Sequence, residues 1–431
     1  MVLAHAVGVR SDLPVPLWSV LVAGALAVLV SFAALSLLWR TPRLRGDLSG
    51  APLPAAAARV LDSRVLRGAL RAVVLAVTLG VVFVALLGPD ETTFNLAPYA
   101  FYVTFWAGIV PASLLLGPVW RAVNPLRTLH AGLARLTGPA PGDGGVPRLG
   151  LWPATGFLLA YAWLELVYPD RALPQTLGLV LVGYGVVQLV AALWYGADWF
   201  AAGDAFEVYS TLLGRLSPLG RRADGRSVLR SPLDGADGTP VVPGLAAFTT
   251  VLVGSTAFDG VSRATWYLDA FSSATATATT LVLLMVVALV AGLYALATRV
   301  GGRLAGIAGA ADLFAHSVVP IAAGYAVAHY FSLLVFEGQL TWILSSNPLG
   351  QDGVDLFGTY RNELDLTTVS PRTIAAVQVG AIVVGHVVGV VLAHDRAVRL
   401  AGRAREARRS QYPLLAVMVG LTVGGLGLLL G

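Results

Sequence analysis

The chain has 431 residues, of which 56% are hydrophobic and only 12% are charged, whereas a typical soluble domain carries about 25% charged residues. So few charges cannot cover the surface of a soluble protein of this size. The composition therefore excludes an ordinary soluble enzyme, a disordered chain and a nucleic-acid-binding protein. The mean hydropathy of +0.75 favours a polytopic helical protein in a lipid bilayer. Because the sequence has no cysteine, it also excludes disulfides, thiolate metal sites and a thiol nucleophile.

Ten apolar runs approach the roughly 20 residues that a helix needs to cross a bilayer. We therefore predict an all-α integral membrane protein, a single polytopic domain over residues 1–431 with about ten transmembrane helices in a bundle. The sixth run is the weakest, because it is short and contains hydroxyl side chains. The predicted spans are Leu17–Leu38, Ala69–Gly88, Pro98–Leu116, Gly150–Tyr168, Thr176–Tyr195, Gly244–Asp259, Ala276–Thr298, Leu313–Phe336, Ile374–His394 and Pro413–Leu430.

All 29 basic residues are arginines, which together with abundant Ala, Val, Leu and Gly indicates a GC-rich bacterial genome. All but five lie in one set of alternating connections, and such basic connections stay in the cytoplasm. We therefore predict a multi-pass protein of the bacterial cytoplasmic (plasma) membrane with both termini outside. The N-terminal segment 1–16 and the long connection 338–372 then face outward. The five arginines on the outer side are Arg10, Arg171, Arg263, Arg361 and Arg372.

Two segments, 69–136 and 148–216, match at an offset of 80 residues, which predicts a duplicated helical-hairpin unit. Each copy should end in a short cytoplasmic interfacial helix, capped by Asn124 in one copy and by Asp204 in the other. An inverted repeat of five spans is the alternative, but fewer positions align in that arrangement. The matching pairs are Pro89-Asp90 with Pro169-Asp170, Asn124 with Asp204, and Leu133–Thr137 with Leu213–Ser217.

Three ionisable side chains fall inside predicted spans, where they are costly and mark functional sites by default. Glu165 and His329 lie toward the outer ends of their spans, and His386 lies near the middle of the membrane. Two histidines and a glutamate are a ligand set compatible with a divalent metal such as zinc. The sequence has no His-Glu-x-x-His spacing, so the cofactor stays open. Structural hydrogen bonding, a transport or proton-relay site, and metal or acid–base catalysis are the three interpretations.

The outer N-terminal segment is a second candidate region. It carries His5, Arg10 and Asp12 ahead of two prolines. These side chains suggest a segment folded over the outer face of the bundle. The alternative is a solvated tail in which Arg10 and Asp12 pair with each other.

Several segments resemble actinobacterial polytopic membrane proteins named fenitrothion hydrolase, and the resemblance extends over nearly the whole chain. It implies hydrolysis of an organophosphate-type ester, a small hydrophobic substrate taken from the bilayer or the outer face. The resemblance supplies no catalytic motif, so we assign the acid–base or metal chemistry to Glu165 and His329, with His386 in support, as a hypothesis. The alternatives are a multi-pass permease or exporter with an intramembrane His/Glu site, and a non-catalytic membrane assembly or partner-binding protein. The segments that carry the resemblance are His5–Pro14, Trp39–Leu44, Trp120–Arg127 and Gly203–Tyr209.

Overall fold

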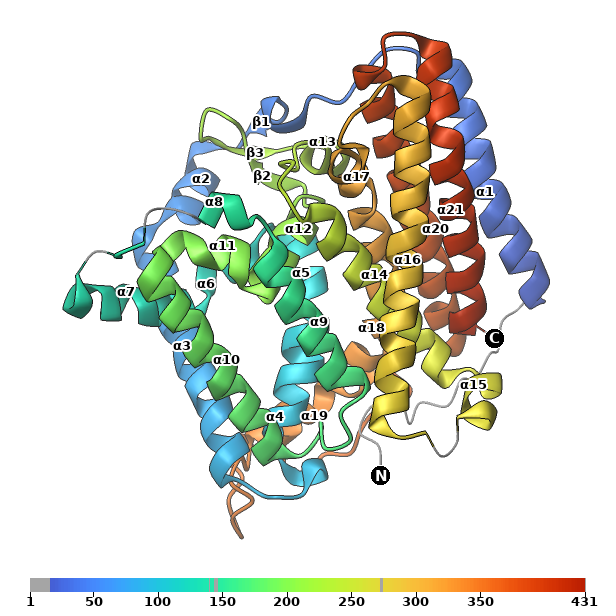
Figure 1. Cartoon of the computed structure of the whole chain (residues 1–431). Coiled ribbons are helices and arrows are strands. Elements are labelled where there is room, and N and C mark those ends of the chain that lie inside the picture. Colours follow the sequence, from blue (N-terminus) through green and yellow to red (C-terminus); the bar gives the residue numbers. More distant parts are fainter. Residues whose placement is uncertain (1–15, 139, 143–145, 272–273, 431) are drawn as a thin grey trace.

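The computed structural model describes residues 16–138, 140–142, 146–271 and 274–430. They form a helical bundle with three short strands at one end (Figure 1). A segment in lipid must satisfy its own backbone hydrogen bonds, and a helix does so. The long helices are α1 (Leu17–Leu38), α3 (Arg64–Leu87), α9 (Trp152–Leu166), α10 (Pro174–Tyr195), α14 (Leu245–Arg263), α16 (Ala276–Ala305), α18 (Val319–Phe336), α20 (Pro371–Leu400) and α21 (Ala404–Leu430).

Within the described residues, nine helical segments are long and apolar enough to cross a membrane. This confirms the prediction of an all-α multi-pass membrane protein. The fourth predicted span, Gly150–Tyr168, is the one missing from these nine, because it corresponds to α9, whose 15 residues are fewer than a full crossing needs. The third span is also irregular, because the π-helical segment Tyr99–Ala107 lies between α4 (Leu96–Pro98) and α5 (Ile109–Leu116).

Shorter elements fill the connections between the long helices. The strands form one antiparallel sheet in the order β1-β3-β2, at the end of the bundle opposite α4 and α19 (Figure 1). These elements are α2 (Ala55–Asp62), α6 (Val119–Val123), α7 (Pro125–Thr137), α8 (Val146–Leu149), α11 (Phe200–Gly203), α12 (Ala205–Gly214), α13 (Pro232–Asp237), α15 (Thr265–Ala270), α17 (Ala310–Phe314), α19 (Gly338–Ser345), β1 (Ala51–Pro52), β2 (Leu219–Arg221) and β3 (Ser227–Leu229).

The helix α12 differs from the predicted surface helix. Nine of its ten residues are buried, whereas α7 is partly exposed. The predicted caps are present, because the side chains of Asn124 and Asp204 each accept hydrogen bonds from the first turn of the following helix. The polar face of α12 is satisfied by protein rather than by lipid headgroups: Arg127 pairs with Glu207, and Ser210 contacts another serine hydroxyl at 2.8 Å.

Three pairs of residues separated by 80 positions contact each other, which is the separation of the predicted copies. A two-fold axis between two copies brings equivalent positions together in this way. In addition, α7 packs on α3 and α10, while α12 packs on α9 and α5, so each final helix contacts both copies. These contacts support the duplication, which stays a prediction. The pairs are Thr92 Oγ1 with Ala172 O at 2.9 Å, Asn124 Nδ2 with Asp204 Oδ2 at 2.8 Å, and Arg127 Nη2 with Glu207 Oε1 at 2.6 Å.

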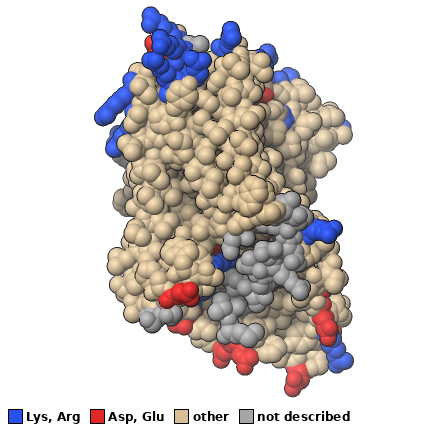
Figure 2. Space-filling view, turned by 90° about the vertical axis from the view of Figure 1, so that its right-hand side faces the viewer, with Lys and Arg blue, Asp and Glu red and all other residues tan. Residues whose placement is uncertain are grey.

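Basic and acidic side chains on the surface gather at opposite ends of the bundle. On the face shown in Figure 2, arginines gather at one end, most of the visible acidic side chains lie at the other, and a broad belt of mostly uncharged residues lies between them. Large apolar side chains are exposed on the long helices, among them Val73 of α3 and Leu281 of α16. Such a belt contacts the hydrocarbon of a bilayer.

Candidate functional site

A cavity of about 350 Å³ lies at the end of the bundle where the α9–α10 connection runs. We call it the outer cavity, after the side to which the arginine distribution predicts that this end belongs. Its volume is in the range of small-molecule sites. Side chains of α9, α14, α18 and the π-helical segment converge on it. Its polar lining residues are Thr92, Tyr99, Tyr102, Glu165, Asp170, Arg171, Asp259, His329, Tyr330 and Glu337.

The most closely packed polar group of the outer cavity joins α14 to α18. Asp259 and Arg263 are four residues apart on α14, so they share one helix face, and the Arg263 Nη2 atom lies 2.8 and 2.9 Å from the two Asp259 carboxylate oxygens. The His329 Nε2 atom lies 2.6 Å from Asp259 Oδ2 and 3.3 Å from Arg263 Nη2. Because an ionised carboxylate only accepts hydrogen bonds, the short contact assigns a proton to Nε2 of the imidazole.

Aromatic side chains hold the walls of the outer cavity in place. The Tyr325 ring stacks on the His329 imidazole, with centroids 5.9 Å apart and planes 15° from parallel. The Trp106 indole N–H donates to the Tyr330 hydroxyl at 2.8 Å. The Tyr102 hydroxyl donates to the Arg171 carbonyl oxygen at 2.9 Å, which ties the α9–α10 connection to the π-helical segment.

Glu165 of α9 and His329 of α18, the two main candidates from the sequence, line the same cavity, and Glu165 is only partly buried. His386 is not among the residues that line it. The His386 side chain is buried within α20, and its Nδ1 atom lies 2.9 Å from the Ile382 carbonyl oxygen one turn earlier. The hypothesis from the sequence gives His386 a supporting role, but the structure does not bring it to this cavity, because the imidazole is held against its own helix.

The predicted metal ligands do not converge. Across the residues that the structure describes, no three His, Asp or Glu side chains form a group that could hold a metal ion. Glu165 and His329 share a cavity that His386 does not reach, which separates the three proposed ligands. The other candidate set, His5, Arg10 and Asp12, lies outside the described residues.

The sequence analysis did not select Asp259 and Arg263, although both contact His329. Asp259 was only the last residue of a predicted span, and Arg263 was one of the few outer arginines. A usable signal was present, because Asp-x-x-x-Arg places an ion pair on one helix face. The pair and His329 both lie toward the predicted outer ends of their spans. Only the packing of α14 on α18 shows that the three side chains meet.

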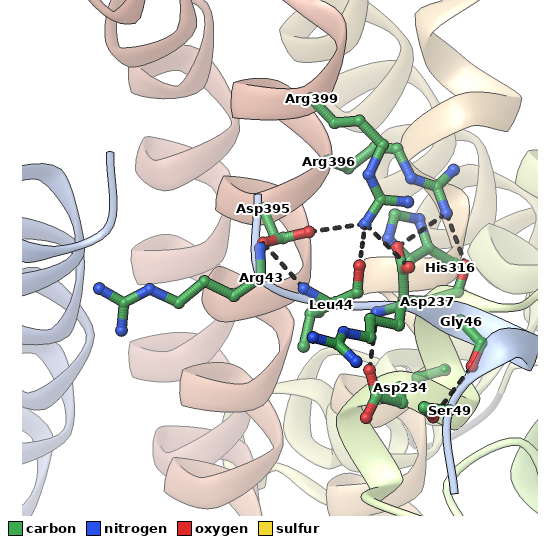
Figure 3. A network of polar contacts seen from close by, with 12 residues as sticks. Arg43, Leu44, Gly46, Ser49, Asp234, Asp237, His316, Asp395, Arg396 and Arg399 are labelled. Carbon is green, nitrogen blue, oxygen red and sulfur yellow. Dashed lines mark hydrogen bonds and ion pairs between the residues drawn. The ribbon is translucent and has the colours of Figure 1, made fainter. Parts of the chain in front are cut away.

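A second polar cluster lies at the arginine-rich end and is shown in Figure 3. The Asp395 carboxylate accepts a hydrogen bond from the Trp39 indole at 2.8 Å and pairs with Arg399 at 2.8 Å. Asp237 pairs with Arg396 at 3.3 Å and with Arg399 at 3.0 Å. Each buried carboxylate has cationic partners, and the cluster fastens the segment after α1 to α20. These contacts give the cluster a structural role and explain the Trp39–Leu44 segment.

Comparisons of the chain with protein-family models, with curated proteins and with solved structures found no match. The outer cavity is therefore judged on its own geometry. Its distinguishing property is a histidine–aspartate pair on the same small cavity as further carboxyl groups, Glu165 among them.

Proposed function

We propose that this protein is a membrane-embedded hydrolase that cleaves a small hydrophobic ester of the organophosphate type in the outer cavity. The observation that carries the proposal is the Asp259–His329 contact of 2.6 Å on the same cavity as Glu165. A histidine held by a carboxylate is a general base, and a second carboxyl group supplies a general acid. The substrate class comes from the resemblance to proteins named fenitrothion hydrolase.

In the proposed reaction, His329 takes a proton from a water molecule as the water oxygen attacks phosphorus. Asp259 stabilises the imidazolium ion that forms, as the aspartate of a catalytic triad does. The new phosphorus–oxygen bond replaces the bond to the leaving group, whose oxygen receives a proton from Glu165. The proton on His329 then returns to Glu165 through solvent. Arg263 contacts Asp259 and acts as a positioning residue.

The proposal is tested by hydrolysis of a nitrophenyl phosphotriester by the purified full-length protein in liposomes. We expect Glu165→Gln and His329→Gln each to lower the rate by about 10²–10⁴-fold, the usual contribution of a general acid or base. Glu363→Gln is the matched control, because this exposed carboxylate lies in the 338–372 connection. Folded Glu165→Gln and His329→Gln proteins with the rate of the unchanged protein would refute the assignment. Absence of hydrolysis by the unchanged protein would refute the activity.

A solute permease is the second candidate, and a specific observation favours it. A second cavity lies at the opposite, arginine-rich end of the bundle, and the buried rings of Trp106, Phe206 and Tyr209 pack on one another within the bundle. Two cavities separated by side chains are the arrangement that alternating access needs. Solute flux into liposomes that is lost in Glu165→Gln, without any ester hydrolysis, would identify the protein as a permease.

A further inference from the structure

The second cavity, which we call the inner cavity, has a volume of about 980 Å³. Its walls come from the first half of α3, from α6 with the end of α5, from the end of α12 and from the β2–β3 hairpin. It therefore lies at the end of the bundle that the arginine distribution assigns to the cytoplasm. Six arginines line it: Arg67, Arg71, Arg121, Arg215, Arg221 and Arg230.

The inner cavity has a large excess of positive charge. Asp47 is the acidic residue among its lining residues. Asp47 is shared by Arg215 at 2.8 Å and Arg230 at 3.0 Å, so one carboxylate serves two guanidinium groups. Arg221 pairs with Asp62, which lies outside the lining. Counting the more distant Glu207 and Asp234, whose charge also acts on Arg230, four carboxylates lie near the six arginines, and Glu207 is already paired with Arg127.

Two of these arginines use their described hydrogen bonds on backbone carbonyl groups. The Arg71 Nε atom donates to the Ala122 carbonyl oxygen at 2.9 Å, and the Arg67 Nη2 atom lies 3.4 Å from the Leu61 carbonyl oxygen. These bonds orient the guanidinium groups without neutralising them. Guanidinium groups bind phosphate through paired N–H donors, which makes arginine the usual residue at such sites.

Arg230 carries part of the excess positive charge of the inner cavity at a buried position. Its side chain is only 4% exposed, and its Nε atom has no hydrogen-bond partner among the described residues. Burial and the positive charge of Arg215 lower the pKa of Arg230. Arginines that only set topology lie in water at the level of the headgroups. The burial of this one beside Arg215 instead indicates a site that is completed by an anion.

The other walls of the inner cavity are apolar and continue to the lipid-facing side of α3. Leu66 and Leu70 line the cavity and are also 41% and 45% exposed. A ligand with a phosphate group among the arginines could therefore place apolar chains along α3. Basic pockets beside spanning helices on the cytoplasmic side bind anionic headgroups in this way.

We infer that the inner cavity binds a phosphate-bearing anion, with the headgroup of an anionic phospholipid as the source that the apolar wall favours and free phosphate as the other source. The site is independent of the chemistry proposed for the outer cavity. It takes its charge from Arg67, Arg71 and Arg121 at its rim, from the half-buried Arg215 and from the buried Arg230.

The test is thermal unfolding of the full-length protein in non-ionic detergent during titration with phosphatidylglycerol, phosphatidylcholine or inorganic phosphate. We expect phosphatidylglycerol to raise the unfolding temperature and phosphatidylcholine to leave it unchanged. Arg67→Gln/Arg71→Gln should weaken the apparent affinity for phosphatidylglycerol at least tenfold. The matched control is Arg299→Gln/Arg303→Gln, which removes two exposed arginines near the end of α16, outside the cavity.

The outcomes separate the two sources. Stabilisation by phosphatidylglycerol but not by millimolar phosphate assigns the lipid, and equal stabilisation by phosphate assigns the free ion. Equal losses of affinity in the two double variants would overturn the site, because they would show general attraction to a basic surface. No stabilisation by either anion would overturn it as well. Arg121→Gln, at an exposed rim position, repeats the test if the first double variant does not fold.

Discussion

The Glu207 side chain is only 1% exposed and has two arginine neighbours, which contact it at different distances. Arg127 is mostly buried and contacts both carboxylate oxygens at 2.6 Å. Arg121 approaches one oxygen only to 3.9 Å and is 55% exposed. A paired contact in protein is strong, whereas solvent and side-chain entropy weaken a long exposed one. The energy of this site therefore depends on Arg127.

We predict that Arg127→Gln lowers the free energy of unfolding by about 3–5 kcal/mol, because it leaves a buried carboxylate without its cation. Arg121→Gln should change it by about 1 kcal/mol or less. Unfolding of the three proteins by heat or by denaturing detergent, in one host detergent without added lipid, measures both values. Equal effects of the two substitutions would contradict this account of the Glu207 site.

The sequence pattern at this site was only partly sufficient. Asp204 caps α12 as predicted, by accepting hydrogen bonds from two backbone N–H groups of the first turn. Glu207 stands three residues after this cap, which is the spacing of a capping box within one helix. Instead it pairs with Arg127, which is 80 residues away. A local pattern can predict a local cap, but it cannot predict a partner that arrives by tertiary packing.

Two G-x-x-x-G motifs, one from Gly385 to Gly389 in α20 and one from Gly420 to Gly424 in α21, pack differently. A Cβ atom on Gly385 of α20 would lie 2.5 Å from the Pro320 carbonyl oxygen of α18. The corresponding position on Gly420 of α21 has no atom within 4 Å among the described residues. Both G-x-x-x-G motifs suggest close helix packing. Only the motif that begins at Gly385 lies against a neighbouring backbone, and the sequence does not show which face of a helix meets another helix.

The glycine contrast gives a second prediction. Gly385→Ala should destabilise the protein by about 1–3 kcal/mol, because the new methyl group meets fixed backbone. Gly420→Ala should be neutral or stabilising by up to about 1 kcal/mol, since alanine is the better helix former. Unfolding midpoints of the two variants in the same detergent compare them. A neutral Gly385→Ala would show that α18 and α20 separate easily.

Most spanning helices could be predicted from hydropathy, because the bilayer imposes a minimum apolar length. The first predicted span, Leu17–Leu38, has the same bounds as α1. The irregular third span and the short α9 could not be predicted from hydropathy, because these segments pack against other parts of the protein and the minimum length set by the bilayer does not fix their shape. At the candidate site, Glu165 and His329 could be identified from the sequence because they are ionisable residues inside apolar spans. It could not select Asp259, which lies at the end of its predicted span.

The arrangement of the whole molecule leads to a prediction about its orientation. Asp224 lies between β2 and β3 at the arginine-rich end, and Asp365 lies in the connection 338–372 near the opposite end. The natural chain has no cysteine, so a single introduced thiol reports its own position. In intact bacterial cells, an impermeant maleimide should label Asp365→Cys and not Asp224→Cys. Permeabilised cells should label both. The reverse pattern in intact cells would contradict the predicted outward termini.

The contacts between positions 80 residues apart have a chemical consequence for the history of this chain. On an axis of symmetry a residue meets its own counterpart, and two identical charges in that place would repel each other. Arg127 and Glu207 attract only because the two segments carry different residues there. Asn124 and Asp204 are likewise a donor and an acceptor. If the segments arose by gene duplication, their divergence at the axis created an attraction between unlike residues. A homodimer of one identical segment could not have this attraction. The fused chain then became the form in which both halves fit.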